Sequence, residues 1–301
     1  MARLLFAKGA RGAVIEDVQS ALAFDPRDID GRYGNQTRDG VLAFQQRRGL
    51  AGTGQVDDET WRALLMKPIP SLFERCLGLT AAFEGHGFSL AQGNFDGAGI
   101  TWGIIGFTLR HGQIAGIVQT IQAVRPDLVR LAFEEHTPQL LAILAAPLAE
   151  QLAFADSVSI GAKKVRLAEP WLSGFDLFGK LPEVRAEQLR RAREDFFDPC
   201  VGTAAGFGLA SERGLALAFD IHVQNGSIKR AAAAEILAAP RPANEAALRR
   251  RIANAVADAS AARFREDVRS RKLAIADGAG AVHSEAFVLE HWGIADLPAP
   301  L

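Results

Sequence analysis

The sequence is poor in the features that mark several common protein classes. It has only two cysteines, Cys76 and Cys200, in 301 residues, and their separation fits no metal or redox motif. The 34 lysines and arginines nearly equal the 35 aspartates and glutamates, so no overall basic field attracts nucleic acid. No stretch approaches the roughly 20 apolar residues of a membrane span. We therefore expect ordinary buried thiols, no nucleic-acid partner and no membrane insertion.

The motifs of several hydrolase classes are also missing. The six histidines are scattered and form no H-E-x-x-H pattern, so no metal ion or other cofactor is expected. Neither cysteine has a nearby histidine that could activate it as a nucleophile. No G-x-S-x-G elbow occurs. These absences argue against a zinc peptidase, a cysteine transpeptidase and a serine hydrolase.

Three short helices are predicted near the N-terminus. Apolar residues recur at helical spacing over 13–23. Thr37 is expected to cap a second helix that ends at Gly49, and Asp57 or Asp58 to cap a third. The glycine-rich segments between them supply the turns. The pattern predicts a small three-helix module.

The module resembles a known family. The segments GARGAVIEDVQSAL, IDGRYGNQT, VLAFQQRRGL and GTGQVDDETWRAL are together similar to the small three-helix peptidoglycan-binding domain. The resemblance covers about residues 8–66, and it implies that domain 1–66 binds wall glycan, with Asp30 and Tyr33 among its contacts. The alternative is a helical module that only packs on its neighbour.

A second, mainly α-helical domain is predicted over 71–301, after a linker at 67–70 that contains two prolines. Its first helix spans 71–87 and carries Glu84 near its C-terminus. The glycine-rich segment 93–107 is expected to form a short hairpin, the one sheet-like element. Further helices are predicted over 113–123, 139–155, 183–197, 213–225, 231–239 and 245–268.

Glu84 and Asp96 are the candidate pair for chemistry. Hydrolysis of a glycosidic bond needs one carboxylic acid to protonate the leaving oxygen and a second carboxylate to activate water or stabilise the transition state. A helix followed by a hairpin would allow the two residues to face one another. The alternatives are a solvated helix-end carboxylate for Glu84 and a turn-forming residue for Asp96.

The same residues carry a second resemblance. AAFEGHG followed by DGAGITWGIIGFT is similar to the lysozyme-type superfamily, and most closely to its chitosanase branch. The resemblance implies a lysozyme-like domain with Glu84 as general acid, Asp96 on the base side and Thr101 helping to position water. The stretch between Glu84 and Asp96 is shorter than in chitosanases, which affects how Asp96 would approach the groove. By resemblance, the mechanism is expected to be inverting.

Candidate substrate contacts are fewer. Trp102 lies beside the hairpin motif, and an aromatic ring can stack on a sugar. Asp220 lies on an apolar helix and is either a substrate contact or a salt-bridge residue. His86 lies beside Glu84 and either tunes that acid or faces solvent.

The two resemblances together predict a muramidase-like glycoside hydrolase that cuts peptidoglycan. Chitosan is the alternative substrate, and a non-catalytic wall-binding structural protein is the alternative from another class. The N-terminus shows no secretory signal. This architecture resembles phage endolysins, which have antimicrobial activity, so we expect a monomer made in the cytoplasm that reaches the wall after release.

Overall fold

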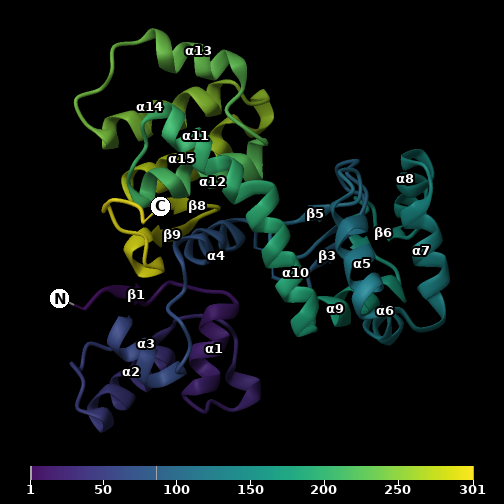
Figure 1. The fold of residues 1–301 in the computed structure, drawn as a ribbon, viewed down its shortest axis with the longest axis horizontal. Helices are drawn as coiled ribbons and strands as arrows, with labels where there is room; N and C mark the ends of the chain where they lie inside the picture. The colour runs from purple at the N-terminus through teal and green to yellow at the C-terminus, as the bar shows by residue number, and fades with distance from the viewer. Residues whose placement is uncertain (1, 86, 301) are drawn as a thin grey trace. The chain divides into compact units, whose positions relative to one another are not determined.

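The computed structural model describes residues 2–85 and 87–300, and its chain forms two compact units. The first unit combines Met1–Phe83 with Asp195–Leu301, and the second is the intervening segment Glu84–Glu194. The fold is mainly α-helical, as predicted (Figure 1). Among the described residues, no helix is both long and apolar enough to cross a membrane.

The N-terminal module contains the three predicted helices and a short antiparallel sheet. The elements are β1 Leu4–Phe6, α1 Ala13–Ala21, α2 Asn35–Arg48, β2 Val56–Asp57 and α3 Asp58–Leu65. Asp57 caps α3 by accepting a hydrogen bond from the Thr60 amide, and Gly49 ends α2 in the left-handed conformation, both as predicted. The prediction that Thr37 caps α2 is wrong. The helix already starts at Asn35, and the buried Thr37 hydroxyl donates instead to the Arg32 carbonyl.

Two buried glutamines hold the loops of this module. Gln19 of α1 accepts a hydrogen bond from the Gly31 amide and donates to Asp30. Gln45 of α2 accepts from the Gly54 amide and donates to the Gln55 carbonyl. A primary amide has both donors and an acceptor, so each glutamine satisfies loop groups of both kinds. Both loop conformations therefore depend on one helical side chain.

The module packs onto the C-terminal part of the first unit through a buried carboxylate. Glu212 accepts hydrogen bonds from Arg3 at 2.5 Å and from Arg75 at 3.4 Å, although its own side chain is fully buried. Its other oxygen accepts a hydrogen bond from the Ala295 amide. The predicted linker is non-helical, and Trp61 donates to the carbonyl of Pro68. The domain limits stay predictions.

The remainder of the first unit is a helical layer with one hairpin. Helix α12 is buried along most of its length and packs against α11, α14 and α15. The elements are α4 Leu72–Glu84, whose last residue begins the second unit, α11 Asp198–Phe207, α12 Glu212–Asn225, α13 Arg230–Ala238, α14 Glu245–Asp258, η4 Ala262–Phe264, α15 Arg265–Asp277, β8 Ala279–Val282, β9 Glu285–Val288 and η5 Leu289–Trp292.

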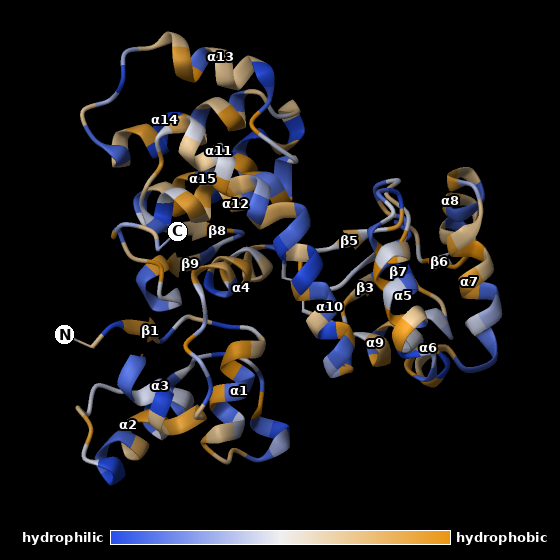
Figure 2. Ribbon diagram, viewed as in Figure 1, coloured by the Kyte–Doolittle hydropathy of each residue, from blue (hydrophilic) through white to orange (hydrophobic). Residues whose placement is uncertain are grey.

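The second unit packs helices around an aromatic core. Phe175 and Phe178 each contact both Trp102 and Phe133, with ring centroids 5.1 to 5.6 Å apart. Figure 2 shows α10 as largely hydrophilic, in keeping with its many charged residues. The elements are β3 Ala91–Gln92, β4 Thr101–Trp102, β5 Phe107–Thr108, α5 Gln113–Val124, α6 Pro126–Phe133, η2 Glu134–His136, α7 Thr137–Ala145, α8 Leu148–Ser157, β6 Ser159–Ile160, β7 Arg166–Leu167, α9 Trp171–Lys180 and α10 Pro182–Ala192, followed by the π-helical turn Arg193–Phe197 that leads into the first unit.

Several predicted elements need correction. The helix predicted over 139–155 is two helices, because the chain is extended at Ala146 and a new helix starts directly after Pro147. The helix predicted over 245–268 is likewise broken, after Asp258. The hairpin is not the one sheet-like element, since three further two-stranded sheets occur in the described residues. Helices α6, α9 and α11 were not predicted, and α15 extends nine residues beyond the predicted segment that ends at 268.

Removal of the Glu212 carboxylate should destabilise the first unit strongly. Glu212→Ala would leave the buried Arg75 guanidinium without its carboxylate partner, and such losses cost about 3–5 kcal/mol. We expect the free energy of unfolding in urea to fall by that amount. Glu235→Ala, at an exposed carboxylate on α13, is the matched control and should change it by less than about 0.5 kcal/mol. Equal effects of the two substitutions would contradict this account.

Candidate active site

Glu84 is the last residue of α4. Leu72, Cys76, Leu79 and Phe83 form the predicted apolar face and are buried, which holds the helix in the core. Gly85 follows with a φ of 68°, a left-handed conformation that ends helices and suits glycine. The helix stops where the glycine predicts, and the Glu84 side chain is half-buried.

Asp96 lies in the loop between β3 and β4. Its side chain is exposed, and Oδ1 accepts a hydrogen bond of 2.9 Å from the Ala98 amide. Asn94 closes the same loop by accepting from the Gly99 amide. The turn-forming role is therefore real. The turn uses only Oδ1. Because Oδ2 accepts no hydrogen bond from the described residues, Asp96 can also act on a substrate or a water molecule.

The hairpin register places Thr101 and Trp102 differently from one another. Thr101 pairs with Gln92 of β3 and Thr108 of β5, and it is buried, with 7% of its surface exposed. Trp102 is 0% exposed, stacks on Phe178 and donates from its indole to the Phe175 carbonyl. The prediction that Trp102 contacts glycan is wrong, because a ring enclosed by the core presents no face to a sugar.

Tyr33 and Asp30, the two glycan contacts predicted in the N-terminal module, differ in their exposure to solvent. Tyr33 is buried, and its hydroxyl donates to the Gly54 carbonyl at 3.1 Å, so it is a core residue and not a glycan contact. Burial raises the pKa of Tyr33 well above its usual value. Asp30 is exposed, and the hydrogen bond from Gln19 lowers its pKa. His86 lies outside the described residues.

Asp220 is a structural residue of the first unit. Its fully buried carboxylate accepts hydrogen bonds from Arg271 at 2.7 Å, Lys272 at 2.5 Å and the Thr80 hydroxyl at 3.0 Å. The salt-bridge interpretation therefore holds, and direct contact with glycan does not. Thr80 lies one turn before Glu84 in α4, and the Arg271 guanidinium lies 5.1 Å from the Phe83 ring. The cluster thus holds the end of the helix that carries Glu84.

Gln188 of α10 supports the hairpin of the second unit. Its buried amide accepts a hydrogen bond from the Ile104 amide and donates to the Phe88 carbonyl. A Cβ at Gly103 would approach Gln188 Oε1 to 2.5 Å, so glycine is required there. One side chain therefore ties the turn after β4 to the segment that follows Glu84.

Sequence reasoning missed two residues beside Asp96. Phe95 is 47% exposed, and Arg110 donates from Nε to the Gly97 carbonyl at 2.8 Å. Exposure of a large ring in a polar loop suits a contact with the apolar face of a sugar. An aromatic residue directly before the aspartate of a glycine-rich turn was the available signal for Phe95. Nothing in the sequence places Arg110 on this loop.

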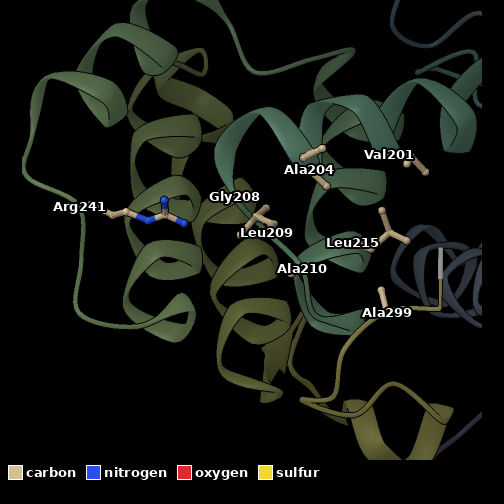
Figure 3. Close-up of a pocket in the computed structure, with 9 residues that line it drawn as sticks. Val201, Ala204, Gly208, Leu209, Ala210, Leu215, Arg241 and Ala299 are labelled. Atoms are coloured by element: carbon tan, nitrogen blue, oxygen red, sulfur yellow. The ribbon is translucent and has the colours of Figure 1, made fainter.

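Two further features of the described residues bear on the site's chemistry. Within residues 2–85 and 87–300, no cluster of three His, Cys, Asp or Glu side chains is arranged to hold a metal ion. A cavity of about 340 Å³ in the first unit is lined mainly by small and apolar residues of α11 and of the segment that follows it, together with Leu215 of α12 and Arg241 (Figure 3). Its lining contains no carboxylate, so it cannot supply an acid and a base.

Comparison with known proteins agrees with both resemblances. Residues 14–64 match the family model described as a putative peptidoglycan binding domain. A GH46 chitosanase from Gynuella sunshinyii, solved with chitotetraose, is similar over 74% of this chain and 99% of its own, with 19% identity and a TM-score of 0.52. A native chitosanase from Bacillus subtilis MY002 gives 18% identity and 0.49 over 68% and 85% of the two chains. Among curated proteins, no relative is found.

The chain therefore joins a module that matches the peptidoglycan-binding family model to a fold similar to that of a GH46 chitosanase. The fused architecture and the fold class are confirmed. The roles of Glu84, Asp96 and Thr101 stay predictions.

Acid should weaken the Asp220 cluster. Burial raises the pKa of Asp220, but Arg271 and Lys272 outweigh this effect and lower it to about 2. Because the folded-state pKa is lower than the unfolded-state pKa, the charged carboxylate stabilises the protein at any pH above the unfolded-state value. This stabilisation, about 2 kcal/mol, is lost as the pH falls from about 4 to about 2. Stability measured against pH should fall more steeply over this range in the wild type than in Asp220→Asn. Identical slopes would contradict the assignment.

Gln188→Leu should loosen the hairpin. It leaves the Ile104 amide and the Phe88 carbonyl without their partner, which should cost at least about 2 kcal/mol. Gln139→Leu, at an exposed position of α7, provides the control and should stay within about 0.5 kcal/mol of the wild type. Chemical denaturation measures both, and a neutral Gln188→Leu would show that the two groups find other partners.

Proposed function

We propose that the protein is a glycoside hydrolase that cuts the glycan strands of the bacterial cell wall. The observation that carries the proposal is the union of a peptidoglycan-binding module with a chitosanase-like fold that has solvent-accessible carboxylates at Glu84 and Asp96. The presence of both carboxylates argues against a purely structural wall-binding protein. Because the substrate lies outside the cytoplasm, the proposed place of action is the cell wall, as for an endolysin.

The proposed mechanism uses the two carboxylates in different roles. Glu84 protonates the glycosidic oxygen as the bond breaks, and Asp96 accepts the proton of the attacking water on the opposite face of the sugar. Asp96 can do so because its loop bond uses Oδ1 and leaves Oδ2 for water. Thr101, on the adjoining strand, helps to orient that water. An inverted anomeric product follows from direct attack by water.

The charge around Asp96 favours peptidoglycan over chitosan. Chitosan carries an ammonium group on each glucosamine, so its binding benefits from additional carboxylates. Here the exposed Arg110 donates to the Gly97 carbonyl, directly after Asp96, and so puts a positive charge at this loop. A cation repels the ammonium groups and attracts the peptide carboxylates of the wall polymer. Chitosan stays the second candidate, because the similar chitosanase was solved with chitotetraose.

The test is product release from purified peptidoglycan and from chitosan. We expect the wild type to release new reducing ends from peptidoglycan, and Glu84→Gln and Asp96→Asn each to lower kcat roughly 10²- to 10⁴-fold, the usual range for loss of an acid or base. Glu150→Gln, at an exposed carboxylate of α8, should retain full activity. Mass spectrometry of the products identifies the bond that is cut.

The outcomes separate the candidates. Activity on chitosan alone would make the protein a chitosanase. Binding to peptidoglycan by a wild type that cleaves neither polymer would support the structural wall-binding protein.

A further inference from the structure

Arg11 connects the N-terminal module to the end of α4. Its backbone is fixed within the module by an antiparallel bridge to Arg32. Its side chain leaves the module, and Nη2 donates a hydrogen bond of 3.0 Å to the Ala82 carbonyl. The same guanidinium forms an ion pair with Glu285 of β9 and lies 5.0 Å from the centre of the Phe287 ring. One side chain thus contacts both the last turn of α4 and the C-terminal hairpin.

The Ala82 carbonyl is one that needs an external partner. The last four carbonyls of a helix have no intrahelical donor, and Ala82 lies two residues before the end of α4. A guanidinium at this point also offsets the partial negative charge of the helix C-terminus. Arg11 therefore stabilises the turn from which the Glu84 side chain projects.

Packing around Phe83 restrains the same turn. Phe287 contacts Phe83 with ring centroids 4.5 Å apart, and Phe83 is buried. Since Arg11 lies against the Phe287 ring, it supports this packing as well as the carbonyl. Phe83 directly precedes Glu84, so movement of its backbone would redirect the carboxylate.

Contacts shortly before Arg11 in sequence join the N-terminal module to the rest of the first unit and so fix the position of Arg11. Arg3 reaches Glu212 and the Gly293 carbonyl, the latter at 2.9 Å. The Ala7 amide donates to the His291 carbonyl, and the His291 ring is hydrogen-bonded to the Lys8 carbonyl. These contacts make the module an integral part of the first unit.

We propose that Arg11, a residue of the wall-binding module, is a positioning residue. It holds the last turn of α4 in place and thereby orients Glu84. The inference rests on the proposed function of Glu84. It gives the module a second task, because the module then contributes to turnover in addition to binding the wall.

Kinetics on a small substrate separate these two tasks. The substrate is soluble glycan strands freed of their peptides by an amidase, so that kcat at saturating substrate measures turnover apart from retention on the insoluble wall. We expect Arg11→Ala to lower kcat about tenfold, as misplacement of a reacting group does, with KM changed less than about twofold. Arg11→Lys keeps a donor for the Ala82 carbonyl and should recover part of kcat. Arg27→Ala, at an exposed arginine of the same module, is the control and should match the wild type.

Hydrogen exchange supplies a measurement that does not depend on activity. In Arg11→Ala, the amides of residues 82–85 should exchange about tenfold faster, while those of α2 keep their rates. Unchanged kcat with unchanged exchange would overturn the proposal. So would a loss of kcat that equals the loss of folded protein, because Arg11 would then act on stability alone.

The two proposals fail in different ways. If the wild type cleaves no glycan, the proposed function is wrong, and the exchange data still decide whether Arg11 holds α4. If the wild type is active and Arg11→Ala keeps full kcat, the function stands and the positioning role is wrong.

Discussion

The first unit depends on two fully buried carboxylates of α12, Glu212 and Asp220. A buried charge is tolerated only when it is paired and hydrogen-bonded. Glu212 and Asp220 lie about two helical turns apart on α12, and both take partners from α4, namely Arg75 and Thr80. Helix α4 is therefore held at two levels by one neighbouring helix. Asp220 also draws in α15, and Glu212 draws in the N-terminal strand through Arg3.

This arrangement explains how a carboxylate can be kept at the end of a helix. Glu84 lies at the negative end of α4, where the helix dipole disfavours a second negative charge. The stability of α4 comes from its buried face and from the pairs at Arg75 and Thr80. These contacts offset the unfavourable placement of a carboxylate at Glu84.

The sequence predicted the elements whose signals are local. The helices of the N-terminal module, the end of α4 before Gly85 and the turn at Asp96 follow from apolar spacing, capping and glycine, and all three are present. The break after Asp258 was missed because no glycine or proline marks it. The burial of Trp102 and Tyr33 could not be predicted, since it depends on Phe178 and Gly54, which are distant in sequence. The role of Gln188 could not be predicted for the same reason, because it binds the Ile104 amide from a helix 84 residues further along the chain.

The first unit is built from the two ends of the chain, and this has a consequence for its biosynthesis. Arg11 and Glu285 are separated by 274 residues, so the N-terminal module leaves the ribosome long before its C-terminal partners exist. The second unit is continuous in sequence and can complete its core while the C-terminal helices are still being made. Closure of the long loop comes last and is entropically costly. Attachment of the N-terminal module to the C-terminal hairpin is thus coupled to completion of the polypeptide, and a chain that ends before β9 lacks Glu285 and Phe287, the partners of Arg11 on that hairpin.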